Sequence, residues 1–247
     1  MSKKNIFYLV INGMDLTGKT SLAGKIKEDC KDKDVQVLRS SFSEKNPLNL
    51  LASRLRKERE QGKFSEETLI ELYKFAKAED PVLYELLKKQ HPIISDEAIG
   101  HLYADATAKE LALFKPTKSI IHDSSTIIKT LTIHEDLGSS PNLIKKLESL
   151  RLAHPKPTKP EYSILLEASP DAKIERLKKR IIEGGFVSEI DKKVIVDPDK
   201  IQRQAKLMKN ITLHTFPGTL VFDTTKMSEQ EVFDAVRNHL EICKERD

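Results

Sequence analysis

The sequence predicts an α/β fold in which a five-stranded parallel sheet is flanked by helices. Five apolar segments, each short enough for a buried strand, alternate with segments of helical periodicity along the 247 residues. The first strand, first helix and second strand are spaced for a right-handed crossover, which makes the two strands parallel. The predicted strands are residues 6–11, 35–39, 119–123, 162–167 and 219–223.

Composition narrows the class of protein. Charged residues make up 32% of the chain and apolar residues 38%, which is typical of a globular protein, and no apolar run approaches the ~20 residues of a membrane span. The net charge of +4 is small for this length and Trp is absent, which disfavours a nucleic-acid stacking surface. Cys30 and Cys243 lack metal-ligand spacing and are interpreted as thiols. We expect a cytoplasmic protein with no membrane and no nucleic-acid partner.

The first strand leads into a phosphate-binding motif, G-x-x-x-x-G-K-T, formed by Gly13, Gly18, Lys19 and Thr20. Glycines let successive backbone N–H groups point at phosphate oxygens, and the following helix adds the partial positive charge of its N-terminus. Lys19 would reach the β- and γ-phosphates, and the Thr20 hydroxyl would hold Mg²⁺. The alternative is a glycine-rich turn with a solvated lysine. The motif is preferred because it follows a strand and opens a helix, and it predicts binding of a nucleoside triphosphate.

Residues 48–115 predict three or four helices, because leucines recur at helical spacing between prolines. Basic side chains on the first of these helices are interpreted as a solvated face rather than an anion site. They are Arg54, Arg56, Lys57, Arg59 and Lys63.

Asp123 ends the third predicted strand. In a chain with this phosphate motif, an acid at the tip of a strand beside the first one is typically next to the metal, directly or through water. We therefore predict that Asp123 helps to bind Mg²⁺. The alternative is a carboxylate that only caps the strand.

A basic helix follows the fourth strand, starting at Ser169-Pro170 and ending at Gly184-Gly185. Its apolar residues Ile174, Leu177 and Ile181 are expected to face inward. A basic helix that ends in a glycine hinge is typical of a lid that closes over phosphates, and the alternative is a solvated charged helix.

Two helices complete the pattern on either side of the fifth strand. Residues 198–211 have helical periodicity, and Ser228 with Glu231 forms a capping box that opens the last helix. No internal repeat interrupts the alternation of strands and helices.

With these residues placed, the chain resembles the thymidylate kinase and deoxynucleoside kinase family of P-loop kinases. The resemblance rests on Gly13-Met14-Asp15 through Thr20, on Asp123, on Lys159-Pro160-Glu161-Tyr162 through Arg180, and on Phe222 through Lys226, which is similar to the family's adenine-packing segment. It implies one P-loop kinase domain over residues 1–247, with a helical acceptor-side region at 46–118 and a lid at 176–197. It also implies ATP as phosphoryl donor, Mg²⁺, a small-molecule acceptor and a homodimer.

The resemblance and the motif together assign roles to individual residues. The residues expected in catalysis are Lys19, Asp15, Asp123, Arg176 and Arg180. Those expected to hold ATP are Gly13, Asp15, Thr17, Gly18, Lys19, Thr20, Ser21, Arg176, Arg180, Thr224, Thr225 and Lys226. Thr20 and Asp123 are the expected metal ligands. The expected acceptor site comprises Asp15, Arg39, Phe42, Lys45, Thr107 and Ser124.

The chain departs from the family where an acceptor phosphate would bind. The family places an Arg directly after the acid of its D-R-[YS] motif, where this chain has Ser124, and thymidylate kinases place another Arg where this chain has Thr107. Both departures remove cations, and a dianionic monophosphate needs such cations. A neutral hydroxyl acceptor is therefore also compatible, unless Arg39, Lys45 or another basic residue takes their place.

Three functions fit the sequence. The first is a kinase for a nucleoside or nucleotide, by analogy with the family. The second is a kinase of the same fold for another hydroxyl compound, such as a sugar. The third is a nucleotide-binding regulatory module without transfer, although the base-reading N-K-x-D motif of GTPases is absent.

Overall fold

The fold is known from a computed structural model. It describes residues 7–30, 34–39, 46–90, 94–113, 118–123, 128, 131–132, 135–136, 138, 141–152, 161–185, 187 and 195–240. The chain divides into two compact units. The sheet unit comprises residues 1–40, 115–132 and 156–247, and the helical unit comprises residues 41–114 and 133–155.

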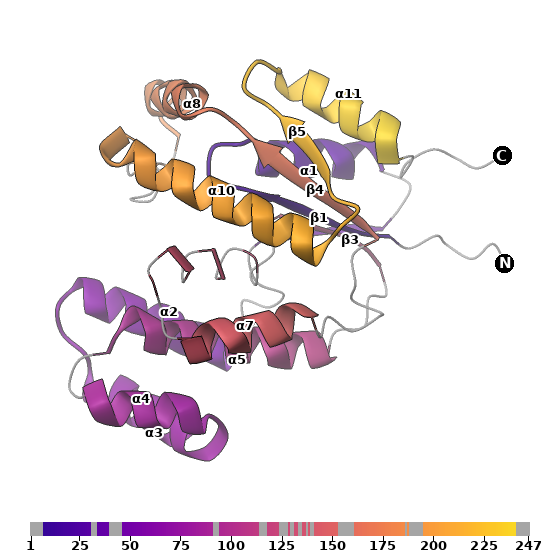
Figure 1. Ribbon diagram of the computed structural model, residues 1–247. Helices are drawn as coiled ribbons and strands as arrows, with labels where there is room; N and C mark the ends of the chain where they lie inside the picture. The colour runs from indigo at the N-terminus through magenta and orange to yellow at the C-terminus, as the bar shows by residue number, and fades with distance from the viewer. Residues whose placement is uncertain are drawn as a thin grey trace, which may run out of the picture. The chain divides into compact units, whose positions relative to one another are not determined.

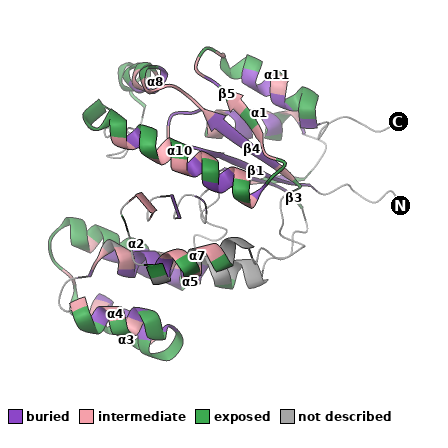
Figure 2. Cartoon of the chain, viewed as in Figure 1, coloured by how far each residue is buried: buried purple, intermediate pink, exposed green. Residues whose placement is uncertain are grey.

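The sheet unit is built on five parallel strands in the order β2-β3-β1-β4-β5 (Figure 1). The strands are β1 (Tyr8–Gly13), β2 (Val35–Arg39), β3 (Ser119–Asp123), β4 (Tyr162–Glu167) and β5 (Leu220–Asp223). Strands β1 and β3 are buried along their whole length, as parallel strands between two helical layers must be (Figure 2). The predicted α/β fold with a five-stranded parallel sheet is confirmed.

Helices cover both faces of this sheet. Leu9 and Ile11 of β1 share a buried cluster with α1 and α11, because alternate residues of a strand point to the same face. Helix α10 contacts β1 and β4 from the other face (Figure 1). The helices of the sheet unit are α1 (Lys19–Asp29), α8 (Pro170–Ile182), α10 (Pro198–Thr215) and α11 (Glu229–Leu240).

Capping residues set the starts of these helices. Ser169 Oγ accepts a hydrogen bond from Ala172 N at the start of α8. Ser228 and Glu231 form the predicted capping box before α11, since Ser228 Oγ accepts from Glu231 N and Glu231 Oε2 accepts from Ser228 N.

The inward face of α8 differs from the expectation at one position. Leu177 is fully buried, but Ile181 is 54% exposed and Lys173 is only 2% exposed. Lys173 precedes Leu177 by four residues and therefore lies on the same helix face. The last turn of α8 carries Ile181 past the apolar cluster that Leu177 shares with Leu16, so the predicted inward position of Ile181 is wrong.

Cys30 caps the C-terminus of α1, is buried and takes part in a disulfide bond. The interpretation of Cys30 as a thiol is therefore wrong. The sequence holds one other cysteine, Cys243, which lies outside the described residues.

The helical unit has its own core. Its helices are α2 (Pro47–Glu60), α3 (Glu66–Glu79), α4 (Pro81–Gln90), α5 (Asp96–Leu113) and α7 (Pro141–Leu152). Each fully buried leucine adds about 1.5–3 kcal/mol to stability, and this core includes Leu51, Leu55, Leu72, Leu83, Leu87 and Leu102. The five basic residues predicted to form a solvated face, at positions 54, 56, 57, 59 and 63, are exposed. Over the described parts of both units, no helix is both long and apolar enough to span a bilayer.

Candidate active site

The loop between β1 and α1 has backbone geometry that its glycines make possible. At Gly13, where φ is +148°, a Cβ atom would lie 2.5 Å from Leu166 O and 2.7 Å from Thr17 Oγ1. At Gly18, φ is +92°, in the region that favours glycine. Leu16 also has a positive φ, +66°, which is strained for a side chain of this size, and it is held by burial. Gly13 therefore allows a close approach between the loop and strand β4, whereas Gly18 allows a left-handed backbone conformation.

The N-terminus of α1 is left without a side-chain cap. Gly18 occupies the N-cap position, the first turn carries no acid, and a Cβ atom at Gly18 would meet nothing within 4 Å. The helices α2, α3, α8 and α10 instead each have a side-chain acceptor at this position. The first backbone N–H groups of α1 can thus accept an anion together with the positive end of the helix dipole. The residues of the loop fit a phosphate group.

Lys19 lies back over the loop, where its Nζ donates to Met14 O at 2.7 Å. Thr17 Oγ1 donates to the same carbonyl at 2.8 Å. Met14 O therefore accepts both bonds and holds the lysine at the mouth of the loop. An ammonium in this position can exchange a neutral carbonyl for a charged phosphate oxygen, which is the stronger acceptor.

Thr20 and Asp123 are brought together although 103 residues separate them. Strands β1 and β3 pair with Ile11 opposite Asp123, and Thr20 Oγ1 donates to Asp123 Oδ2 at 2.6 Å. Hydroxyl and carboxylate oxygens are ligands that Mg²⁺ accepts, with phosphate oxygens and water completing the octahedron. The described residues contain no group of three or more His, Cys, Asp or Glu that could hold a metal without such a ligand. The pair fits a metal that arrives with a nucleotide.

Arg176 connects α8 to the loop. Its Nη1 donates to Leu16 O at 2.9 Å and to Thr224 Oγ1 at 3.1 Å, and its Nη2 donates to Thr224 O. Thr224 Oγ1 in turn donates to Glu167 O at 2.8 Å. Burial lowers the pKa of Arg176. The guanidinium and the Thr224 hydroxyl thus brace the loop, and their predicted contacts to ATP remain predictions.

Lys173 is a cation of this region that the sequence reasoning missed. Burial, and then the neighbouring charge of Lys19, lower the pKa of the Lys173 ammonium to about 8, although Asp15 and Glu167 oppose the shift. The available signal was its position four residues before Leu177, on the inward face of α8. Composition alone suggested a solvated lysine.

Three other predicted ATP contacts lie near the start of α11. Ser21 Oγ donates to Glu229 Oε1 at 2.9 Å. Thr225 N donates to Asp223 Oδ1 at 2.9 Å, and Lys226 is exposed. Ser21 and Thr225 therefore hold local structure here, and their contacts to a nucleotide remain predictions.

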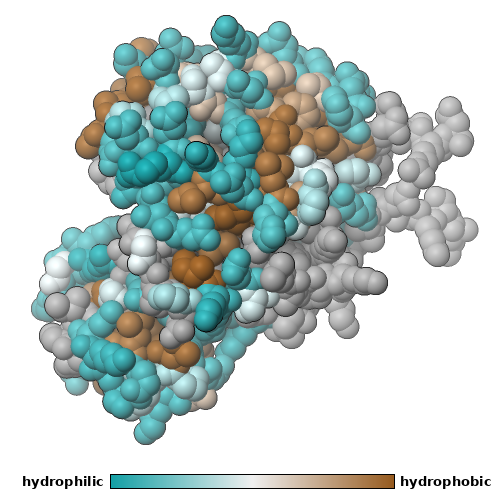
Figure 3. All heavy atoms as spheres, viewed as in Figure 1, coloured by the Kyte–Doolittle hydropathy of each residue, from teal (hydrophilic) through white to brown (hydrophobic). Residues whose placement is uncertain are grey.

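The predicted lid, residues 176–197, is described at its two ends, while residues 186 and 188–194 lie outside the described residues. Arg180 is partly buried, and its side chain lies against Gly185, where a Cβ atom would meet Arg180 Cγ at 2.8 Å. Apolar side chains are also exposed at these ends of α8 and α10, where Figure 3 shows brown surface: Ile181, Ile182, Ile195 and Val196. Each end of the predicted lid is therefore apolar as well as basic.

The predicted acceptor residues are mostly not placed. Phe42, Lys45 and Ser124 lie outside the described residues, and only the backbone of Arg39 in β2 and of Thr107 in α5 is described. Asp15 is partly buried in the loop. The acceptor site therefore remains a prediction.

Five parallel strands with helices on both faces define the class of fold, which is α/β and is shared with solved structures of kinases. One solved structure that shares it is thymidylate kinase from Candida albicans, with a TM-score of 0.56 and 15% identity over 96% of this chain and 91% of that one. Another is deoxyadenosine kinase from M. mycoides, solved with dCMP and dCDP bound, with a TM-score of 0.51 and 13% identity over 96% and 100% of the two chains. No protein-family model and no curated protein matches the sequence. Likeness at this level of identity shows the fold.

Proposed function

We propose that this protein is an ATP-dependent kinase that transfers the γ-phosphoryl group to a small-molecule acceptor, with a nucleoside or nucleotide as the leading candidate. The observation that carries the proposal is the Thr20 to Asp123 hydrogen bond beside an uncapped helix N-terminus. A phosphate loop alone binds anions, but a loop with a hydroxyl and a carboxylate at its edge can bind a metal-bound triphosphate.

Bound ATP with Mg²⁺ supplies the phosphoryl group, and the residues of this chain hold and orient it. The Lys19 ammonium would exchange Met14 O for oxygens of the β- and γ-phosphates, and Thr20 and Asp123 would hold the metal. Asp15 holds the acceptor hydroxyl or takes its proton. Phosphoryl transfer needs positioning and charge neutralisation more than covalent chemistry, and these groups supply both.

The remaining predicted residues complete the proposal. Arg176 and Arg180 neutralise charge on the phosphates as the lid closes, and residues 224–226 pack on the base. A homodimer, a cytoplasmic location and the absence of a nucleic-acid partner belong to the same proposal.

Two kinds of acceptor follow from the residues. A nucleoside or nucleotide is supported by the likeness to thymidylate kinase and deoxyadenosine kinase. A different hydroxyl compound is favoured by Ser124 and Thr107, which replace two cations of the family pattern. Arg39, Phe42 and Lys45 are proposed to contribute to the acceptor site in either case.

The test is an ATP-consumption assay of the purified protein against panels of nucleosides, nucleoside monophosphates and sugars. Lys19→Ala should lower the rate with the best acceptor at least about 100-fold, because the terminal phosphates lose their charge partner. The matched control is Lys27→Ala, an exposed lysine on the same helix, which should keep the rate. Consumption that is absent from the wild type, or unchanged in Lys19→Ala, would refute the proposed reaction.

A further inference from the structure

The Lys173 side chain is buried on the face of α8 that packs against the phosphate loop. Two other residues of this face fix its position: Arg176 Nη1 donates to Leu16 O at 2.9 Å, and Leu177 packs on the Leu16 side chain. Lys173 lies three and four residues before them, and its charge interacts with those of Lys19 and Asp15. The ammonium therefore belongs to the loop region rather than to solvent.

Among the described residues, the ammonium of Lys173 makes no ion pair, although Asp15 and Glu167 lie near enough to act on its charge. Within the described part of the chain, no hydrogen bond or ion pair to Lys173 Nζ is present, although the side chain is only 2% exposed. The nearby carboxylate of Glu167 is engaged elsewhere, because Glu167 Oε2 lies 2.6 Å from Lys209 Nζ. Buried lysines are rare without a partner, since burial disfavours the charged form. Such a group is a cost to folding unless a ligand uses its charge.

The neighbourhood indicates the charge and shape of that ligand. Two ammonium groups, Lys19 and Lys173, lie close enough to lower the pKa of Lys173, and the uncapped N-terminus of α1 adds partial positive charge. A single carboxylate or phosphate would occupy the loop amides and Lys19 alone. A chain of phosphates has several oxygens and can engage both lysines together.

We propose that Lys173 is a second phosphate-binding lysine, which contacts the terminal phosphoryl group of a polyphosphate chain held by residues 13–20. The proposal rests on the nucleotide binding proposed above and not on the transfer step. It adds a residue of α8 to the phosphate site, which the motif alone places in the loop. It also gives a reason for a lysine on an otherwise inward-facing position.

The experiment compares wild type with Lys173→Met, which keeps the length and packing of the side chain without its charge. Inorganic tripolyphosphate and MgATP are titrated in turn, and affinity is measured by calorimetry. For Lys173→Met we expect affinity for tripolyphosphate to fall roughly 10- to 100-fold, as for loss of a charged hydrogen bond. Lys178→Met, an exposed position on the same helix, is the matched control and should bind as the wild type does.

Stability of the ligand-free protein separates binding from a structural role. Removing an unpartnered buried charge should leave the urea midpoint of Lys173→Met equal to or above that of the wild type, while ligand affinity falls. A lower midpoint with unchanged tripolyphosphate affinity would mean that Lys173 only supports the fold, and would overturn the proposal.

A second measurement uses only the wild type, so that the proposal can still be tested if Lys173→Met fails to fold. The lysine side chains are labelled with ¹³C at Cε, and their NMR signals are followed with and without tripolyphosphate. The Lys173 signal should shift when the ligand is added and the Lys178 signal should not, whereas an unchanged Lys173 signal at saturating ligand would overturn the proposal. A ligand-shifted Lys173 signal in a protein that transfers phosphate to no acceptor would defeat the proposed reaction and leave this inference standing.

Discussion

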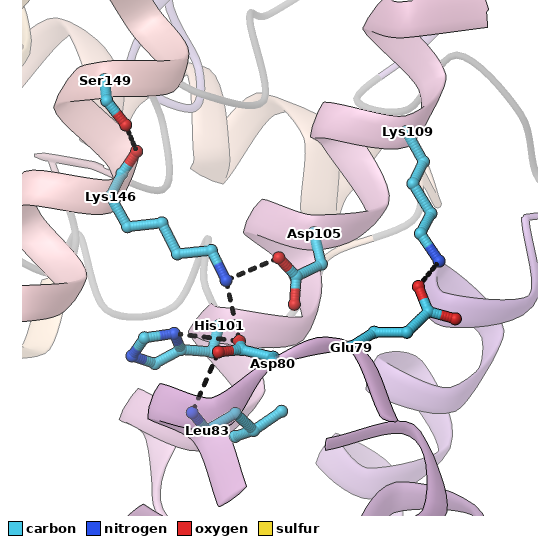
Figure 4. A network of polar contacts seen from close by, with 8 residues as sticks. All are labelled: Glu79, Asp80, Leu83, His101, Asp105, Lys109, Lys146 and Ser149. Carbon is cyan, nitrogen blue, oxygen red and sulfur yellow. Dashed lines mark hydrogen bonds and ion pairs between the residues drawn. The ribbon is translucent and has the colours of Figure 1, made fainter. Parts of the chain in front are cut away.

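Two lysines, one in each unit, differ in the charged groups that surround them. Within the described part of the sheet unit, Lys173 makes no ion pair, and only the more distant charges of Asp15 and Glu167 oppose its own. Lys146 on α7 of the helical unit makes two ion pairs, because its Nζ lies 2.8 Å from Asp80 Oδ2 and 2.5 Å from Asp105 Oδ1 (Figure 4). His101 adds a fourth group, with Nδ1 3.4 Å from the same Asp80 oxygen.

This difference in ion pairing distinguishes Lys146, which is a structural cation, from Lys173, which is suited to binding a ligand. Lys146 joins α7 to α5 and to the turn between α3 and α4, so its charge is used within the fold. A buried charge that is paired and hydrogen-bonded costs little, whereas an unpaired one destabilises the fold. In the helical unit the charge of Lys146 is thus paired within the fold, whereas the charge of Lys173 is available to an anion.

The largest effect is expected when the helical network is broken at Asp80. Burial raises the pKa of this carboxyl, but hydrogen bonds from His101, Lys146 and the Leu83 backbone outweigh it and hold the pKa well below its usual range. Asp80→Asn should therefore lower the free energy of unfolding by about 3–5 kcal/mol at pH 7, because the half-buried Lys146 and the buried His101 lose their shared carboxylate.

Chemical unfolding monitored by circular dichroism measures this loss. The control is Glu79→Gln at the adjacent position, where an exposed pair with Lys109 should contribute less than about 1 kcal/mol. Equal losses in the two variants would show that the buried network does not stabilise the helical unit.

A smaller change in the free energy of unfolding, of the opposite sign, is expected at Lys173. Its pKa is about 8 in the fold and 10.5 in an unstructured chain, so between these values the unfolded state binds more protons. The stability of the ligand-free wild type should rise relative to Lys173→Met as pH increases from about 8 to 10.5, by up to about 3 kcal/mol. Parallel urea titrations across this range test it, and a constant difference between the two proteins would contradict an unpaired lysine.

The smallest change in the free energy of unfolding is expected at Asp105. Burial, and then the neighbouring Asp80, raise the pKa of Asp105 to about 6 despite Lys146. The folded state then binds more protons between pH 4 and 6, so this contribution to stability is lost as pH rises through that window. Wild type should lose about 1–2 kcal/mol relative to Asp105→Asn between pH 4 and 7. Thermal unfolding at several pH values measures it, and a difference that grows in the other direction would reverse the assignment.

The sheet unit was largely predictable because its signals are local. Strand lengths, the glycines of the loop, and the caps at Ser169 and Ser228 follow from residues close together in sequence, and the structure confirms the strands and caps. Asp123 was also found from sequence, because an acid at the end of a short apolar run is a recognisable pattern once the loop is known. The structure adds its 2.6 Å bond to Thr20.

The sequence by itself determined the parallel α/β fold and predicted the phosphate loop and the candidate metal pair, because these depend on short-range periodicity and motif spacing. Tertiary structure decided which charges are buried. Lys173 and Lys146 look like ordinary solvated lysines in the sequence, and Ile181 looks like a core residue. Whether a helical position is covered depends on the elements that pack over it, which are far away along the chain, and this long-range packing made one lysine a structural cation and left the other for a ligand.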